Sequence, residues 1–171
     1  MAQARLPGDD AVFTISRTFD APRALVWKAH TDCRHLMHWW GPKGFAMRHC
    51  KIDLRPGGML HYGLRGPDGS DIWGRIVYRA IKEPERLEFI TSFSDEKGGI
   101  TRHPMNAKWP LQTLAVVVFT EAGGKTRIDL TWTPHEATVE EIVAFAAGKP
   151  SMTQGWTGTM DQLAEHLAKA A

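Results

Sequence analysis

The 171-residue sequence is poor in cysteine and has no long apolar run. Its two cysteines, Cys33 and Cys50, are too few for a disulfide framework and lack the paired spacing of a zinc site. No stretch approaches the roughly 20 consecutive apolar residues of a membrane span. The start, MAQARLPGDD, also lacks the apolar core of a secretion signal. These absences predict a reduced, cytoplasmic protein without a membrane span.

A strong net charge of either sign is missing as well. The 21 lysines and arginines nearly balance the 19 aspartates and glutamates, and the two signs are mixed along the chain. Clustered basic residues are the electrostatic footprint of proteins that bind nucleic acids or anionic membranes. The composition therefore argues against a nucleic-acid or membrane-surface partner.

Short apolar segments separated by turn-forming residues dominate the middle of the chain. Pro-Gly-Gly, Pro-Asp-Gly, Glu-Pro-Glu and Gly-Gly clusters supply the backbone conformations that tight turns need. Strands are predicted over 11–20, 45–55, 59–65, 71–81, 86–93, 111–121 and 126–134. Two short helices are predicted over 23–31 and 33–40. A helical region starts at Thr138, is interrupted at 148–150 and ends near the C-terminus.

This order of elements predicts an α+β fold with one antiparallel sheet of six or seven strands. Such a sheet twists and curls, and its apolar concave face needs a cover. The terminal helix, with an apolar stripe that includes Trp156 and Leu163, is the only element long enough to provide it. Because one helix cannot fill a curled sheet, we expect a cavity between them. We expect a single domain over 11–171 after a flexible N-terminus, 1–10.

Several motifs, spread over residues 12–169 in a fixed order, resemble one known family. They are FDAPRALVWKAHT, WWGPKGF, DLRPGGMLHYGLRGPDG, GRIVYRAIKEPERLEF, TRIDLTWTP and QGWTGTMDQLAEHL. The chain is similar to the Hsp90 ATPase activator homologue 1-like family of the START/Bet v 1 superfamily. The resemblance implies the helix-grip fold, with a curved sheet around the C-terminal helix and an apolar pocket between them. The superfamily includes lipid carriers, small-molecule binders, cyclases, hydrolases and co-chaperone domains, so it implies no single activity.

Adjacent tryptophans, Trp39 and Trp40, end the second short helix just before Gly41-Pro42. Neighbouring residues of a helix point about 100° apart, so one helix face cannot bury both rings. We expect one ring to anchor the helix in the core and the other, for which Trp40 is the candidate, to line the cavity. The alternative is that both rings pack in the core.

The candidate ligand-binding residues are mostly aromatic, aliphatic or methionine side chains. Those on the terminal helix are Met152, Trp156 and Met160, because methionine suits an adaptable binding surface. Those on the strands are Tyr62, Trp73, Phe89, Leu114, Val116 and Trp132, whose inward or outward phase is not fully determined. The long irregular segment 94–110 contains Met105 and Trp109, together with His103. Its length is typical of a lid or binding loop, but a mobile surface loop is an equal alternative.

His49 and His61 are the best acid–base candidates, because histidine titrates near neutral pH and the two lie on neighbouring strands. They are also candidates to orient a ligand. His35 and His38 are one helical turn apart, but no third ligand accompanies them. The chain has neither a phosphate-binding loop nor a nucleophile elbow. We therefore expect no metal and no cofactor.

Three interpretations remain open. The first is binding of a small hydrophobic or amphipathic molecule in the cavity. The second is an enzyme that acts on a hydrophobic substrate there. The third is an Hsp90 co-chaperone-like module, which we rank last because the resemblance covers only the C-terminal domain of the eukaryotic activator. A homodimer is compatible with exposed aromatic residues around a pocket mouth.

Overall fold

The computed structural model describes residues 10–170, so nearly all of the expected flexible N-terminus lies outside the described residues. The strands are β1 (Phe13–Phe19), β2 (Ala46–Ile52), β3 (Met59–Arg65), β4 (Asp71–Lys82), β5 (Arg86–Ser94), β6 (Ile100–Thr101), β7 (Thr113–Ala122) and β8 (Lys125–Pro134). The helices are α1 (Arg23–Thr31), α2 (Cys33–Trp39), α3 (Val139–Ala147) and α4 (Lys149–Ala170). Apart from β6, the expected order of helices and strands is confirmed.

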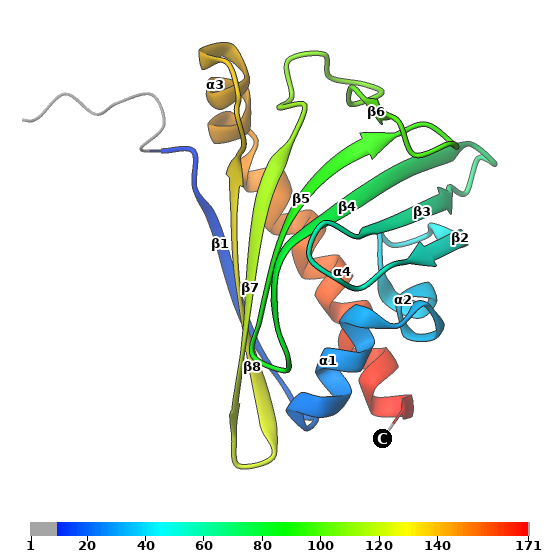
Figure 1. Cartoon of the computed structure of the whole chain (residues 1–171), viewed down its shortest axis with the longest axis vertical. Coiled ribbons are helices and arrows are strands. Elements are labelled where there is room, and N and C mark those ends of the chain that lie inside the picture. Colours follow the sequence, from blue (N-terminus) through cyan, green and yellow to red (C-terminus); the bar gives the residue numbers. More distant parts are fainter. Residues whose placement is uncertain (1–9, 171) are drawn as a thin grey trace, which may run out of the picture.

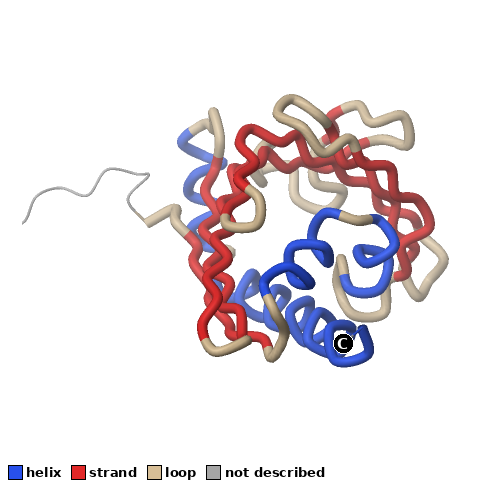
Figure 2. Tube along the Cα trace, turned by 60° about the horizontal axis from the view of Figure 1, so that its bottom comes forward, coloured by secondary structure: helices blue, strands red, loops and turns tan. Residues whose placement is uncertain are grey.

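The strands form one antiparallel sheet in the order β1-β8-β7-β5-β4-β3-β2, with β6 paired to β5. The sheet curves, and α4 runs along its concave side with α1 and α2 beside it (Figures 1 and 2). Within residues 10–170 the sheet has eight strands rather than the expected six or seven. The additional strand, Ile100–Thr101, lies in the segment that was expected to be irregular. Two residues are too few to show an alternating pattern.

Alternation along the strands separates a buried face from an outer one. On β7 the side chains of Ala115, Val117 and Phe119 are buried, and on β8 those of Ile128 and Leu130 are buried. The apolar stripe of α4 packs against this face through Met152, Met160, Leu163 and Leu167. Burial of these side chains contributes roughly 25 cal/mol per Å² of apolar surface. It is the main force that holds α4 against the sheet.

Local sequence signals set the helix ends that frame the concave face. The carboxylate of Asp32 accepts a hydrogen bond from the Arg34 backbone N–H and so caps α2. Thr138 and Glu141 form a reciprocal capping box at the start of α3. At Gly148 the chain leaves α3 and enters α4, as the sequence predicts.

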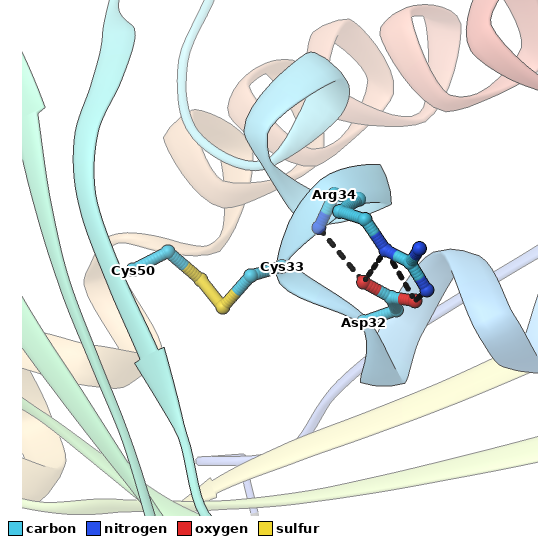
Figure 3. Close-up of a disulfide and its surroundings, with 4 residues drawn as sticks. All are labelled: Asp32, Cys33, Arg34 and Cys50. Carbon is cyan, nitrogen blue, oxygen red and sulfur yellow. Dashed lines mark hydrogen bonds and ion pairs between the residues drawn. A yellow bond between two sulfur atoms is a disulfide. The ribbon is translucent and has the colours of Figure 1, made fainter.

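A disulfide joins Cys33, the first residue of α2, to Cys50 of β2 (Figure 3). The two residues are 17 apart in sequence, and their Cα atoms are 5.8 Å apart in the fold. The prediction of reduced cysteines is therefore wrong. Absence of a disulfide framework does not exclude one bridge between segments that the topology brings together. No helix within residues 10–170 is both long and apolar enough to cross a membrane.

Candidate functional site

A cavity of about 760 Å³ lies between the concave face of the sheet and the first half of α4. Its boundary also includes the end of α2 and the loop between β6 and β7. Ligand pockets in proteins typically measure about 300–1,000 Å³. The space is therefore large enough for a drug-sized molecule.

Trp39 and Trp40 occupy different environments. Trp39 is 2% exposed, and its indole N–H donates to the backbone oxygen of Ala29 at 2.8 Å. Trp40 caps α2 with extended backbone angles, φ −70° and ψ 129°, so its side chain leaves the helical arrangement. Its ring borders the cavity. One tryptophan thus anchors α2 and its neighbour contributes to the cavity, as the first of the two interpretations predicts.

Five aromatic rings follow one another along the cavity, and we call this set the aromatic arc. Consecutive ring centroids are 5.9, 6.1, 6.1 and 6.0 Å apart, and the rings are tilted or edge-to-face. In order, the members are Tyr62, Trp40, Trp156, Trp132 and Trp109. They come from β3, the end of α2, α4, β8 and the loop before β7. The arc therefore depends on the whole tertiary fold.

Tyr62 lies over a glycine of the next strand. Gly74 is its register partner on β4, and a Cβ atom there would collide with the Tyr62 ring. Burial raises the pKa of the Tyr62 phenol, while a hydrogen bond with the Trp40 side chain opposes this effect. Tyr62 therefore stays a neutral phenol over the physiological range.

The β6–β7 loop places His103 at the cavity. The backbone N–H of Met105 donates to His103 Nδ1 at 3.0 Å, and the ring packs 4.7 Å from that of Phe93, centroid to centroid. Burial lowers the pKa of His103. An Nδ1 that accepts a hydrogen bond carries no proton, so the neutral ring bears its proton on Nε2.

Ionic contacts connect the same loop to α3. Arg102 pairs with Glu141, a buried carboxylate, and Lys108 pairs with Glu140 at 3.2 Å. Met105 lies at the cavity boundary and is 86% exposed. The loop therefore borders the cavity, while its action as a lid stays a prediction.

Most predicted binding residues border the cavity: Trp40, Tyr62, Trp73, Met105, Trp109, Trp132, Met152 and Trp156. Phe89 does too. Trp73 is a special case: the residue borders the cavity, but its ring lies on the outer face of the sheet, where it stacks on His61 with the ring centroids 5.2 Å apart.

Five predicted residues do not border this cavity: His49, His61, Leu114, Val116 and Met160. His49 and His61 lie on the outer face, where they contact each other and Trp73. His61 also contacts the backbone oxygen of Asp95 at 3.1 Å through Nε2. An acid–base role in the cavity is therefore not available to these two histidines.

The other three residues, Leu114, Val116 and Met160, lie away from the cavity for simple reasons. Leu114 and Val116 alternate with Thr113 and Ala115, which do border the cavity. Met160 is buried deeper in the core, beside a separate void of about 20 Å³.

Some cavity residues were not predicted as binding residues. Gly155 of α4 borders the cavity with open space where a Cβ would be, and Gly74, which does not itself border the cavity, admits the ring of Tyr62, which does. A glycine within a strand often marks a close approach of another group, which was a usable signal for Gly74. For Gly155, helix periodicity alone gives no such signal.

The histidine pair suggested as one edge of a metal site packs against a third histidine. His35 Nδ1 lies 2.8 Å from His166 Nε2, and the His38 ring stacks on His166. Within residues 10–170 no group of three or more histidine, cysteine, aspartate or glutamate side chains is arranged to hold a metal ion.

A curved antiparallel sheet that grips a long C-terminal helix defines the helix-grip class of proteins. Residues 20–168 match the family described as "Activator of Hsp90 ATPase homolog 1-like protein". The chain therefore belongs to this family. A search among curated proteins finds no match.

Solved structures of bacterial proteins share the fold. A crystal structure from Mycobacterium smegmatis is 27% identical, with a TM-score of 0.75 over 95% of this chain and 94% of that one. An NMR structure from Arthrobacter aurescens is 28% identical, with a TM-score of 0.77 over 97% and 90%. A protein from Silicibacter pomeroyi, described as AHSA1, is 18% identical, with a TM-score of 0.70 over 94% and 100%. At that identity the likeness concerns the fold alone.

Proposed function

We propose that the protein binds a small hydrophobic molecule in the cavity between the sheet and α4. The observation that carries this proposal is a cavity of about 760 Å³ bordered by the aromatic arc. Aromatic side chains offer large apolar contact areas, and their transfer out of water on ligand binding is favourable.

The borders of the cavity suit a ligand whose body is apolar. Trp40, Trp109, Trp132 and Trp156 border it on several sides, and Met152 adds a flexible thioether. Polar groups are few and lie among apolar ones, as in known small-molecule sites. The described residues offer no comparable arrangement for an enzymatic mechanism through His49 and His61, which lie on the outer face.

Gly155 offers a direct test, because a side chain there would enter open space at the cavity. Gly155→Leu should block the cavity without a clash, and it replaces a residue that disfavours helices. Gly158→Leu is the matched control, since Gly158 is on the same helix, does not border the cavity and faces the flexible Lys43 side chain.

The measurement is quenching of tryptophan fluorescence by ethylanthracene, an uncharged aromatic probe. Saturable quenching by the wild type should weaken at least about tenfold in Gly155→Leu and change less than about twofold in Gly158→Leu. Absence of saturable binding to the wild type, or equal binding to both variants, would reject a ligand site in this cavity. Urea denaturation of both variants checks that each is folded.

A further inference from the structure

We propose that the ligand is an uncharged aromatic molecule with a hydrogen-bond acceptor, such as a ketone, and that His103 orients it by donating from Nε2. This inference rests on the proposed function, because it concerns the same cavity. It adds the chemical class of the ligand and names one specificity-determining residue on the β6–β7 loop.

The first argument is electrostatic. Among the described residues that border the cavity there is no lysine, arginine, aspartate or glutamate. A charged ligand group inside would lose its hydration without gaining an ionic partner, which is strongly unfavourable. His103 does not supply a charge either, because burial lowers its pKa. The lining therefore selects an uncharged ligand.

The second argument is the direction of the His103 hydrogen bonds. Nδ1 accepts from the backbone N–H of Met105 at 3.0 Å, which places the proton of the neutral ring on Nε2. Within residues 10–170 Nε2 has no hydrogen-bond partner in the protein, and the ring borders the cavity. His103 is thus a donor with unused capacity at the loop end of the cavity.

The third argument is that the neighbouring polar groups do not compete as acceptors. The side-chain oxygen of Asn106, on the same loop, already accepts from the backbone N–H of Lys108 at 3.1 Å. The indole of Trp109, whose ring centroid is 6.2 Å from that of His103, can only donate. The loop end of the cavity therefore offers donors, and the complementary ligand group is an acceptor.

Three anthracenes substituted at the same ring carbon test this inference at about pH 8, where His103 is neutral. Acetylanthracene carries a neutral acceptor, ethylanthracene carries none, and anthracene carboxylate carries a charge. His103→Phe removes the donor and keeps a ring beside Phe93. The quantity measured is the ratio of the ketone and hydrocarbon affinities, so any general loosening of the loop cancels.

The wild type should bind the ketone roughly five to ten times more tightly than the hydrocarbon, the contribution of one hydrogen bond. In His103→Phe this ratio should fall to about one, and His103→Gln, which retains a donor, should restore part of it. The carboxylate should bind at least about tenfold more weakly than the ketone.

An unchanged ratio in His103→Phe overturns the orienting role of His103, and tighter binding of the carboxylate overturns the uncharged class. If ethylanthracene binds but the wild-type ratio is one, this inference fails and the proposed function stands. If none of the three binds, the proposed function fails.

Discussion

The ring of Tyr62 covers Gly74, its register partner on the neighbouring strand, on the concave face of the sheet. One position along, the arrangement is reversed: Trp73 of β4 covers Gly63 of β3 on the outer face. Each aromatic ring thus occupies the space that the partner glycine leaves empty. The two pairs hold β3 against β4 from both sides.

These pairs supply matched variants for the inner and outer faces. Gly74→Ala would force the Tyr62 ring away from β4, and we expect it to lower the free energy of unfolding by about 1–3 kcal/mol and to weaken ethylanthracene binding. Gly63→Ala should have a similar effect on stability by displacing Trp73, but should leave probe affinity unchanged. Urea unfolding and fluorescence titration separate the two effects. Equal loss of affinity in both variants would contradict the assignment of Tyr62 to the cavity.

Replacement of Trp39 and replacement of Trp40 should have different effects on the free energy of unfolding and on probe affinity. Trp39→Ala removes a buried ring and its hydrogen bond to Ala29, so we expect a loss of about 3–5 kcal/mol in the free energy of unfolding. Trp40→Ala should cost less stability and weaken probe binding more, because its ring borders the cavity. The pair of measurements is informative in combination. If Trp40→Ala lowers the free energy of probe binding by no more than it lowers the free energy of unfolding, the ring of Trp40 only packs in the core.

The Cys33–Cys50 disulfide should contribute measurably to stability. Its 17-residue separation corresponds to roughly 3 kcal/mol in the chain-entropy treatment of a loop of about that length. We expect dithiothreitol to lower the free energy of unfolding of the wild type by about 2–4 kcal/mol. The double variant Cys33→Ala/Cys50→Ala should show the lower value with or without reductant. Any response of that double variant to reductant would point to a cause other than this bond.

The free energy of unfolding should fall on acidification because the buried histidine His30 has a lowered pKa in the folded protein. His30 packs between Trp39 and Phe119, its Nδ1–H donates to the Val26 oxygen, and burial lowers its pKa from 6.5 to about 4. The unfolded chain therefore binds more protons between these pH values. The stability that neutral His30 provides is complete above pH 6.5 and is lost as the pH falls towards 4.

Thermal or urea unfolding at a series of pH values measures this effect. At about 1.4 kcal/mol per pKa unit, the contribution of His30 is at most about 3.5 kcal/mol. His30→Gln should be less stable near neutral pH and lose less stability on acidification than the wild type. His103 and His166 also have lowered pKa values and leave a residual slope in the variant. Parallel curves for wild type and variant would exclude His30 as the source.

The sequence predicted the fold well, because each turn cluster, helix cap and apolar stripe is a local signal. It was harder to predict which side chains of a strand face inward where apolar and polar residues do not alternate clearly. Leu114 and Val116 lie in an almost continuously apolar stretch, so nothing in the sequence shows which alternate residues face inward. On β2 an irregularity in register between Met47 and His49 shifts the phase of the strand. The disulfide depends on the distance between α2 and β2, which spacing along the chain does not reveal.

The disulfide between α2 and β2 also bears on how a molecule could enter and leave. Trp40 follows α2 directly, so this side of the cavity is held to the sheet by a covalent bond. At the other end, the β6–β7 loop is held to α3 by the Arg102–Glu141 and Lys108–Glu140 ion pairs and by packing. Separation there breaks no covalent bond, and the exposed Lys108–Glu140 pair can exchange its partners for water. Of these two sides, the loop side is therefore the one that can separate from its neighbouring element without breaking a covalent bond.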